Sequence, residues 1–295
     1  MDSKPVNNEI LMPIREDFLE IFEIFMDENQ KTKIRANTVR QYAEGIIDLL
    51  LKDKIVPVLK PNEVYEGINW GRKIKIIREH YDSEIADDIQ EIFKVGGDGS
   101  HFSGKVEYED LQMIINKAVH IIENIFVKYF LTPGHEFGTE NIFTIFSMLP
   151  LKHRIYILER VSKYYTNKDV VDRLSLAYVK SGDSNKAIDL LKKSLQDETI
   201  DRCYYEYKLK ALSVLEANID ELYRQNAEYE KSPESSKAII VGDLWVVGLP
   251  TSKNVFDTAK AMRVFSSWFE KAKDQYPEFI NLFFYLMKTD ERQYI

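Results

Sequence analysis

The sequence has few of the residues that cross-link or interrupt a chain. Cys203 is the single cysteine among 295 residues, which excludes a disulfide within the chain and a cysteine-built zinc cluster. Glycine and proline are also sparse, at 12 and 9 residues, while apolar residues recur at helical spacing over long stretches. The sequence therefore predicts a mainly α protein. Its length suits one large domain or two ordinary ones.

Motifs for catalysis and for cofactors are absent as well. The chain has no nucleophile elbow, no Walker loop, no dinucleotide fingerprint and no zinc signature. The stretch GGDGSH at 96–101 has neither the spacing of a phosphate-binding loop nor a strand before it. His120 and His135 lie on different elements without a partner at helical spacing, so we expect no metal. We expect no cofactor and interpret the chain as non-enzymatic.

The charge and the apolar runs limit the partners. The net charge of −8 disfavours direct binding of nucleic acid, which needs a basic surface. It is compatible with competition against nucleic acid for a basic protein partner. No run approaches eighteen apolar residues, and the start MDSKPVNNE lacks the apolar core of a signal peptide. We therefore expect a cytoplasmic protein that makes no membrane contact.

A stretch rich in helix breakers, residues 131–139, divides the chain into two helical domains. We expect a helical domain over 32–131 and a C-terminal helical domain over 140–295. In the first domain the periodicity predicts successive helices, one of which, 83–94, has Ser83 as its capping residue. A last helix is expected over 108–131.

Residues 1–31 form an acidic amphipathic arm in which Phe18, Phe22 and Phe25 recur at helical spacing. Two interpretations stay open for this stripe. The helix docks on the core of its own chain, or it is a detachable anchor that lays the three phenylalanines on a partner. These residues are the candidates for partner binding.

The C-terminal domain combines a helical hairpin with a short β-rich stretch. Small and apolar residues of 176–195, among them Ala177, Gly182 and Ala187, resemble one tetratricopeptide-type repeat, but no second copy follows at its period. Two β-branched runs around Gly242 and Asp243 predict a β-hairpin near 238–249. Aromatic residues are dense nearby, and we take five of them as candidates for self-association: Trp245, Trp268, Phe269, Phe283 and Phe284.

Residues 94–101 contain three closely spaced glycines and end at His101. We expect a glycine-rich loop here, joining the helix that ends at Lys94 to the long helix over 108–131. With the helix order around it, this loop makes residues 32–131 resemble HEPN-like helical domains of bacterial and phage defence systems. In active members of that family, an arginine and a histidine of such a loop cleave RNA across a dimer interface. Here Lys94 stands in the place of the arginine.

Two interpretations of this loop stay open. Lys94 and His101 could serve a HEPN-like ribonuclease or toxin, because a histidine shuttles protons and a cation stabilises a phosphorane-like transition state. Alternatively, the glycines make a tight turn of an inherited scaffold. A third possibility is a helical scaffold subunit without either activity.

The chain as a whole resembles phage-encoded anti-defence proteins directed against the Gabija system. The resemblance rests on length, on a composition rich in Lys, Ile, Asn and Tyr, on the acidic start MDSKPVNNEIL, and on the aromatic C-terminal domain. It implies a non-enzymatic inhibitor in the host bacterial cytoplasm. Such an inhibitor forms a homo-oligomer around a defence complex of a nuclease and a helicase-like subunit, and keeps that complex from binding and cutting DNA.

Overall fold

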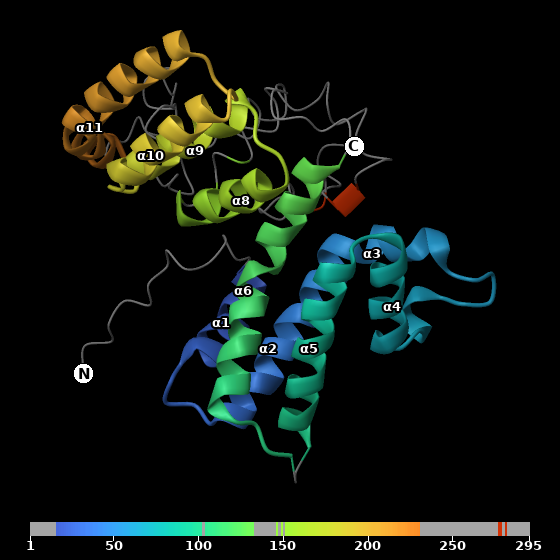
Figure 1. Ribbon diagram of the computed structural model, residues 1–295. Coiled ribbons are helices and arrows are strands. Elements are labelled where there is room, and N and C mark those ends of the chain that lie inside the picture. Colours follow the sequence, from blue (N-terminus) through green and yellow to red (C-terminus); the bar gives the residue numbers. More distant parts are fainter. Residues whose placement is uncertain are drawn as a thin grey trace. The chain divides into compact units, whose positions relative to one another are not determined.

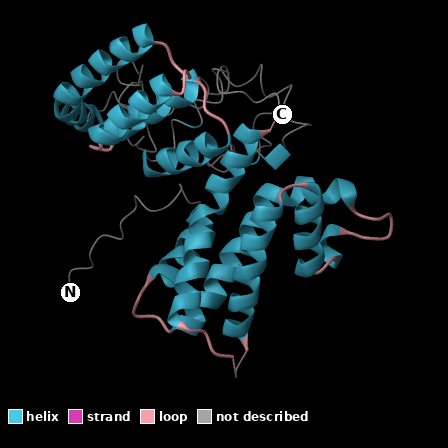
Figure 2. Cartoon of the chain, in the orientation of Figure 1, coloured by secondary structure: helices cyan, strands magenta, loops and turns pink. Residues whose placement is uncertain are grey.

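The computed structural model describes residues 16–101, 104–132 and 151–230, with the single positions 146, 149, 277, 278 and 281. Within these residues the regular structure is helical and no residue belongs to a strand (Figure 2). The prediction of a mainly α protein is therefore confirmed. The β-hairpin expected near 238–249 lies outside the described residues.

The contacts within the chain separate two units, and the boundary falls inside a helix, between Lys128 and Tyr129. The N-terminal unit contains the described residues up to 128 together with 277, 278 and 281. The second unit contains the described residues from 129 to 230. We expected residues 277–281 in the C-terminal domain, but those described contact the N-terminal unit. The predicted boundaries of the arm and of the two domains stay predictions.

The described elements of the N-terminal unit are all helices or single helical turns. They are α1 (Glu16–Met26), α2 (Thr32–Ile46), the π-helical turn η2 (Ile47–Leu51), α3 (Lys52–Ile55), the 3-10 turns η3 (Val56–Val58) and η4 (Tyr65–Gly67), α4 (Trp70–His80), α5 (Ser83–Ser100) and α6 (Tyr108–Leu131). Helices α1, α2, α5 and α6 run side by side as a bundle, and α4 lies against α5 (Figure 1). The bundle core is built from large side chains that are almost fully buried: Phe25, Tyr42, Ile46, Ile47, Leu50 and Phe126.

The start of α5 differs from the prediction in its capping residue. Ser83 is the first helical residue, and Asp82 before it is the cap, because its Oδ1 accepts a hydrogen bond from the Ile85 amide at 3.0 Å. The negative charge of an aspartate at this position also interacts favourably with the positive end of the helix dipole. The same arrangement begins α4, where the Asn69 side chain accepts from the Arg72 amide at 2.9 Å.

The second unit is a stack of antiparallel helices. They are α8 (Leu151–Tyr164), α9 (Lys168–Lys180), α10 (Ser184–Gln196) and α11 (Arg202–Glu230). Each helix packs on the one before it, and α11 also packs on α9. The stretch 176–195, expected to form a helical hairpin, contains the turn between α9 and α10. Gly182 in that turn has a φ of +83°, which is a left-handed conformation that favours glycine.

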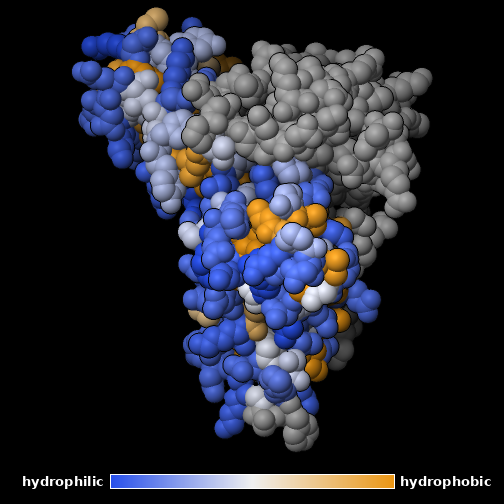
Figure 3. Space-filling view, turned by 90° about the vertical axis from the view of Figure 1, so that its right-hand side faces the viewer, coloured by the Kyte–Doolittle hydropathy of each residue, from blue (hydrophilic) through white to orange (hydrophobic). Residues whose placement is uncertain are grey.

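The surface that carries α3 and α4 is mostly hydrophilic, and its apolar side chains form separate small patches (Figure 3). The large exposed apolar residues of the described N-terminal unit are Ile34, Val56, Val64, Tyr108 and Met113. None of the helices in the described ranges is both long enough and apolar enough to cross a membrane.

Candidate functional site

The stretch expected to be a glycine-rich loop is helical, which corrects the prediction. Helix α5 is 18 residues long: it continues through Gly96, Gly97 and Gly99 and ends at Ser100. Glycine weakens a helix by about 1 kcal/mol relative to alanine, and for this reason the sequence suggested a break. Packing against another helix outweighs this preference here.

Two of the glycines form the contact between α5 and α2. A Cβ atom on Gly96 would lie 2.5 Å from the Arg40 Cβ and 2.9 Å from the Ala36 carbonyl oxygen. A Cβ on Gly99 would lie 2.8 Å from the Lys33 carbonyl oxygen. Gly96 and Gly99 are three residues apart and so share one face of α5. They allow the backbones of α5 and α2 to approach more closely than any side chain would permit.

Lys94 and His101, the two residues of the ribonuclease hypothesis, are separated along the axis of α5. Lys94 is exposed on α5, and His101 follows the last helical residue as its C-cap. The helical rise places Ser100 about 9 Å along the axis from Lys94. The His101 backbone carbonyl accepts a hydrogen bond from the Lys33 ammonium group, and Gly104 donates to the same carbonyl at 3.1 Å. Among the described residues, no hydrogen bond joins Lys94 to His101.

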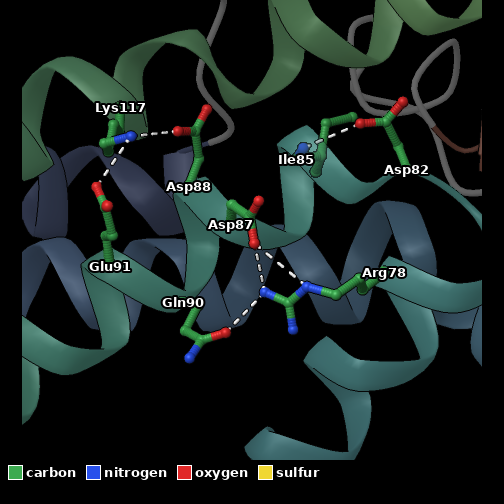
Figure 4. Close-up of polar contacts among 8 residues, drawn as sticks. All are labelled: Arg78, Asp82, Ile85, Asp87, Asp88, Gln90, Glu91 and Lys117. Carbon is green, nitrogen blue, oxygen red and sulfur yellow. Dashed lines mark hydrogen bonds and ion pairs between the residues drawn. The ribbon is translucent and has the colours of Figure 1, made fainter.

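Charged side chains tie α5 to the helices on both of its sides (Figure 4). Arg78 of α4 donates from Nε to Asp87 at 3.2 Å and from its terminal nitrogen to Gln90 at 2.7 Å. On another face of α5, Lys117 of α6 pairs with Asp88 and lies 3.0 Å from Glu91. Burial opposes the charge of Lys117, but its hydrogen bonds to these carboxylates raise its pKa above the usual value. This network fixes α5 in the bundle.

One lysine of the N-terminal unit, Lys73, lies between two aromatic rings. The Lys73 ammonium lies 3.8 Å from the ring centre of Tyr65 and 4.0 Å from that of Trp70. It also bonds Asp48 Oδ1 at 3.0 Å, and its side chain is only 7% exposed. The Tyr65 hydroxyl donates to the same carboxylate, and burial together with Asp48 raises the Tyr65 pKa well above its ordinary value.

This arrangement depends on an irregularity in the backbone. Asp48 lies in the π-helical turn Ile47–Leu51, which joins α2 to α3. A π-turn accommodates one residue more than an α-turn and is frequent at functional sites. Lys52 and Glu66, 3.1 Å apart, connect α3 to η4 beside the same tyrosine. Since the lysine itself fills the space between the two rings, we interpret the cluster as a lock that holds the segment 59–69 on the bundle.

The second unit contains a partly buried group of ionisable residues between α9 and α11. Asp172 of α9 accepts hydrogen bonds from the Tyr204 hydroxyl and from Lys208, both on α11. Burial alone would raise the Asp172 pKa, but the charge of Lys208 and the two hydrogen bonds lower it below its usual value. The Lys168 ammonium lies 4.4 Å from the Tyr204 ring centre on the other side.

Lys180, the last residue of α9, has a strongly lowered pKa. Its side chain is buried, with 6% of its surface exposed. Burial first, and then the charges of Arg154, Lys208 and Arg173, lower the Lys180 pKa to about 6. Buried lysines with such values occur in active sites and also in purely structural ionic networks.

Of the candidates for partner binding, Phe22 and Phe25 are buried, with 2% and 0% of their surface exposed. The Phe25 ring lies 5.6 Å from that of Tyr42, and Arg35 of α2 donates to the Phe25 carbonyl at 2.8 Å. In this structure α1 is therefore docked on its own chain, and partner binding by these two residues would require α1 to leave the bundle. The Phe18 side chain lies outside the described residues.

The five aromatic candidates for self-association also lie outside the described residues: Trp245, Trp268, Phe269, Phe283 and Phe284. Within the described ranges, no group of three or more His, Cys, Asp and Glu side chains is arranged to hold a metal ion. Neither the Lys73 cluster nor the buried Lys180 was predicted from the sequence. The pair Tyr65 and Trp70 in an otherwise polar stretch was the available signal for the first, and a lysine on the apolar face of α9 for the second.

Comparison with known proteins yields no relative: no family model, no curated protein and no solved structure matches the chain. The resemblances to HEPN-like domains and to anti-defence proteins therefore stay predictions.

Proposed function

We propose that the chain is a non-enzymatic protein-binding inhibitor, of the kind by which phages evade immunity. It forms a homo-oligomer around a bacterial anti-phage nuclease complex of the Gabija type and blocks DNA binding and cleavage by that complex. This proposal takes its target from the whole-chain resemblance. The described residues contribute a candidate binding surface.

The outward face of α11 is the observation that carries the binding proposal. Tyr207 and Val214 are 68% and 57% exposed and lie seven residues apart, so they share one side of the helix. Cys203, one turn before Tyr207, is exposed as well. Exposed tyrosines are enriched at protein interfaces, and helices stacked as antiparallel hairpins commonly present such surfaces to partners.

The position of the glycine face supports a non-enzymatic function over the ribonuclease alternative. A catalytic loop needs its acid–base group and its cation to meet at one reacting phosphate. Gly96 and Gly99 are instead buried in the contact with α2, and Lys94 lies about two helical turns from His101. The contact with α2 therefore accounts for these glycines without a catalytic pair.

Co-expression with a Gabija nuclease and its helicase-like partner tests the proposal. The chain is expected to co-purify with the complex and to abolish DNA cleavage by it. The variant Tyr207→Ala with Val214→Asp is expected to weaken co-purification about tenfold or more, because tyrosines in a buried interface contribute strongly to affinity. Tyr164→Ala is the control, since it removes a tyrosine of α8 that is 64% exposed.

Two results would contradict the proposal. The first is a chain that neither co-purifies with the defence complex nor changes DNA cleavage. The second is a mass by light scattering that corresponds to a monomer at all concentrations, which rejects an inhibitor that surrounds its target. A loss of the cellular phenotype in His101→Ala, with folding and assembly unchanged, would favour the ribonuclease instead.

A further inference from the structure

Helix α11 ends the described stack and packs within its unit through one side. Lys208, Leu212 and Leu215 are buried and recur at helical spacing on the side that contacts α9 and α10. Both of these helices lie on the same side of α11 (Figure 1). The described residues on the other side of α11 are exposed.

The exposed side of α11 carries residues at the spacing by which two helices pair. Alternating steps of four and three residues connect five exposed residues, which we call the seam: Cys203, Tyr207, Lys210, Val214 and Ala217. A mean step of about 3.5 residues keeps such a row facing a partner helix along its whole length. Helical stacks normally present a polar surface at an open edge, so an exposed tyrosine and valine there indicate a neighbour.

The charges on the exposed side of α11 balance, although the whole chain carries a net charge of −8. The exposed charged residues of α11 up to residue 219 are Arg202, Glu206, Lys210 and Glu216, two cations and two carboxylates. Arg202 Nε lies 3.1 Å from Glu206 Oε1 on the same helix. Like charge opposes contact between copies elsewhere on the chain, but two α11 helices meet without net repulsion.

We propose that the seam pairs with the seam of a second copy of the chain, the two α11 helices running antiparallel. In a parallel pair each seam residue would face its own counterpart, which would bring two Lys210 charges together. In an antiparallel pair with its two-fold axis between residues 208 and 209, Lys210 instead faces Tyr207 of the second copy, and symmetry repeats the contact. An ammonium group over a tyrosine ring is favourable, and so is the antiparallel arrangement of the helix dipoles.

The outer layers of the same pair are apolar, because Cys203 of each copy faces Val214 of the other. The seam from Cys203 to Ala217 is about 21 Å long and a helix is about 10 Å wide, so the strip falls short of the roughly 800 Å² per partner in a stable interface. We therefore expect a weak pairing that depends on concentration. An oligomer that surrounds its target needs several contacts between copies, so the purpose of this one rests on the proposed function.

The single native cysteine provides a test of the pairing and of its direction. Val214→Cys, at a position that is 57% exposed, is oxidised as full-length protein with copper–phenanthroline. The expected product is a dimer on a non-reducing gel, bridged between Cys203 of one copy and the new thiol of the other. Two controls are expected to stay monomeric on the gel: the wild type, and Val214→Cys combined with Cys203→Ser. In both, equal positions lie about 16 Å apart along the axis, whereas a disulfide needs Cα atoms within about 7 Å.

Each other pattern of bridges contradicts the pairing. A disulfide in the wild type would join Cys203 to Cys203 and show a parallel pair. Equal bridging with and without Cys203 would show another register or random collision. No bridge in any of the three proteins would show that these faces do not meet.

Charge at the centre of the seam provides a second test, by sedimentation velocity over a concentration series. Lys210→Glu is expected to weaken self-association at least tenfold, because it removes both contacts with Tyr207 and brings a carboxylate toward Glu206 of the other copy. Lys210→Arg keeps a cation over the ring and should stay within about threefold of the wild type. Lys192→Glu is the matched control, since it makes the same change of charge on α10 at a side chain that is 58% exposed. Equal weakening by the two glutamates would show an effect of net charge alone and would overturn the pairing.

Co-expression of Val214→Cys with the Gabija-type complex separates the pairing from the proposed function. A bridged dimer that leaves the complex unbound and active would contradict the proposed function, while the bridge would still support the pairing. Inhibition by a protein that forms no bridge would overturn the pairing and leave the proposed function standing. A protein that neither forms the bridge nor inhibits would reject both.

Discussion

Alanine substitutions at the neighbouring residues Gly96 and Gly97 of α5 should change the free energy of unfolding in opposite directions. A Cβ on Gly96 would meet the Arg40 Cβ at 2.5 Å, whereas carbon atoms in contact are normally about 3.5–4.0 Å apart. The Arg40 Cβ is fixed to the backbone of α2, so the two helices must separate by about 1 Å. Overpacking of this kind costs about 1–3 kcal/mol, and the better helix propensity of alanine returns about 1 kcal/mol. We expect Gly96→Ala to destabilise the unit by up to about 2 kcal/mol.

Gly97→Ala is the matched comparison in the same helix. Its Cβ would meet only the end of the Arg40 side chain, at 3.8 Å, which is an ordinary contact. Helix propensity then decides the outcome, and we expect a stabilisation of about 0.5–1 kcal/mol. Gly99→Ala should behave like Gly96→Ala, because its Cβ would approach backbone atoms of Lys33 and Asn37 at 2.8 and 3.1 Å.

Urea denaturation followed by far-UV circular dichroism measures these differences as shifts of the transition midpoint. If α5 packs on α2 through Gly96, the alanine substitution must lower the stability at position 96 and raise it at position 97. If Gly97→Ala destabilised the protein as much as Gly96→Ala, the segment would be a loop with glycine-specific backbone conformations. That result would refute the packing argument.

Three further predictions concern charged residues. Asp82→Ala should destabilise α5 by about 1 kcal/mol in urea denaturation, whereas Asp82→Asn, which keeps the capping oxygen, should cost only a fraction of this. Lys73→Met should cost about 1–2 kcal/mol through the lost ion pair and ring contacts, against less than about 0.5 kcal/mol for Lys75→Met, whose ion pair is exposed. Lys180 has a pKa of about 6 in the folded chain and 10.5 as its reference value, so the unfolded chain binds the extra proton between these values. Stability should therefore rise with pH across that window, and Lys180→Met should remove the rise; an unchanged slope would contradict the burial argument.

The sequence predicted those features of the fold that depend on periodicity. The expected long helix 108–131 matches α6, which runs from Tyr108 to Leu131, because its apolar stripe is long and uninterrupted. Glycine misled the prediction at α5, since a propensity of about 1 kcal/mol per residue is a local quantity. The partner helix that reverses its effect lies about sixty residues earlier in the chain.

The charged sites were beyond sequence reasoning for a related reason. Asp48 and Lys73 are 25 residues apart, and Asp172 and Lys208 are 36 residues apart. No local pattern tells which distant acidic residue such a lysine pairs with. The contacts of Glu278 and Asn281 with Lys54 and Asp53 could not be predicted either, because a polar residue within an aromatic stretch gives no indication of its distant partner.

The π-turn at Ile47–Leu51 absorbs one residue more than regular α geometry would hold. Five residues of a π-turn and four of an α-helix cover nearly the same rotation about the helix axis, so the elements after the turn keep their direction relative to α2. Removing one residue there would therefore convert the turn to α geometry and leave the orientation of α3 almost unchanged. The effect of a single missing codon would be confined to the turn itself, where Asp48 pairs with Lys73.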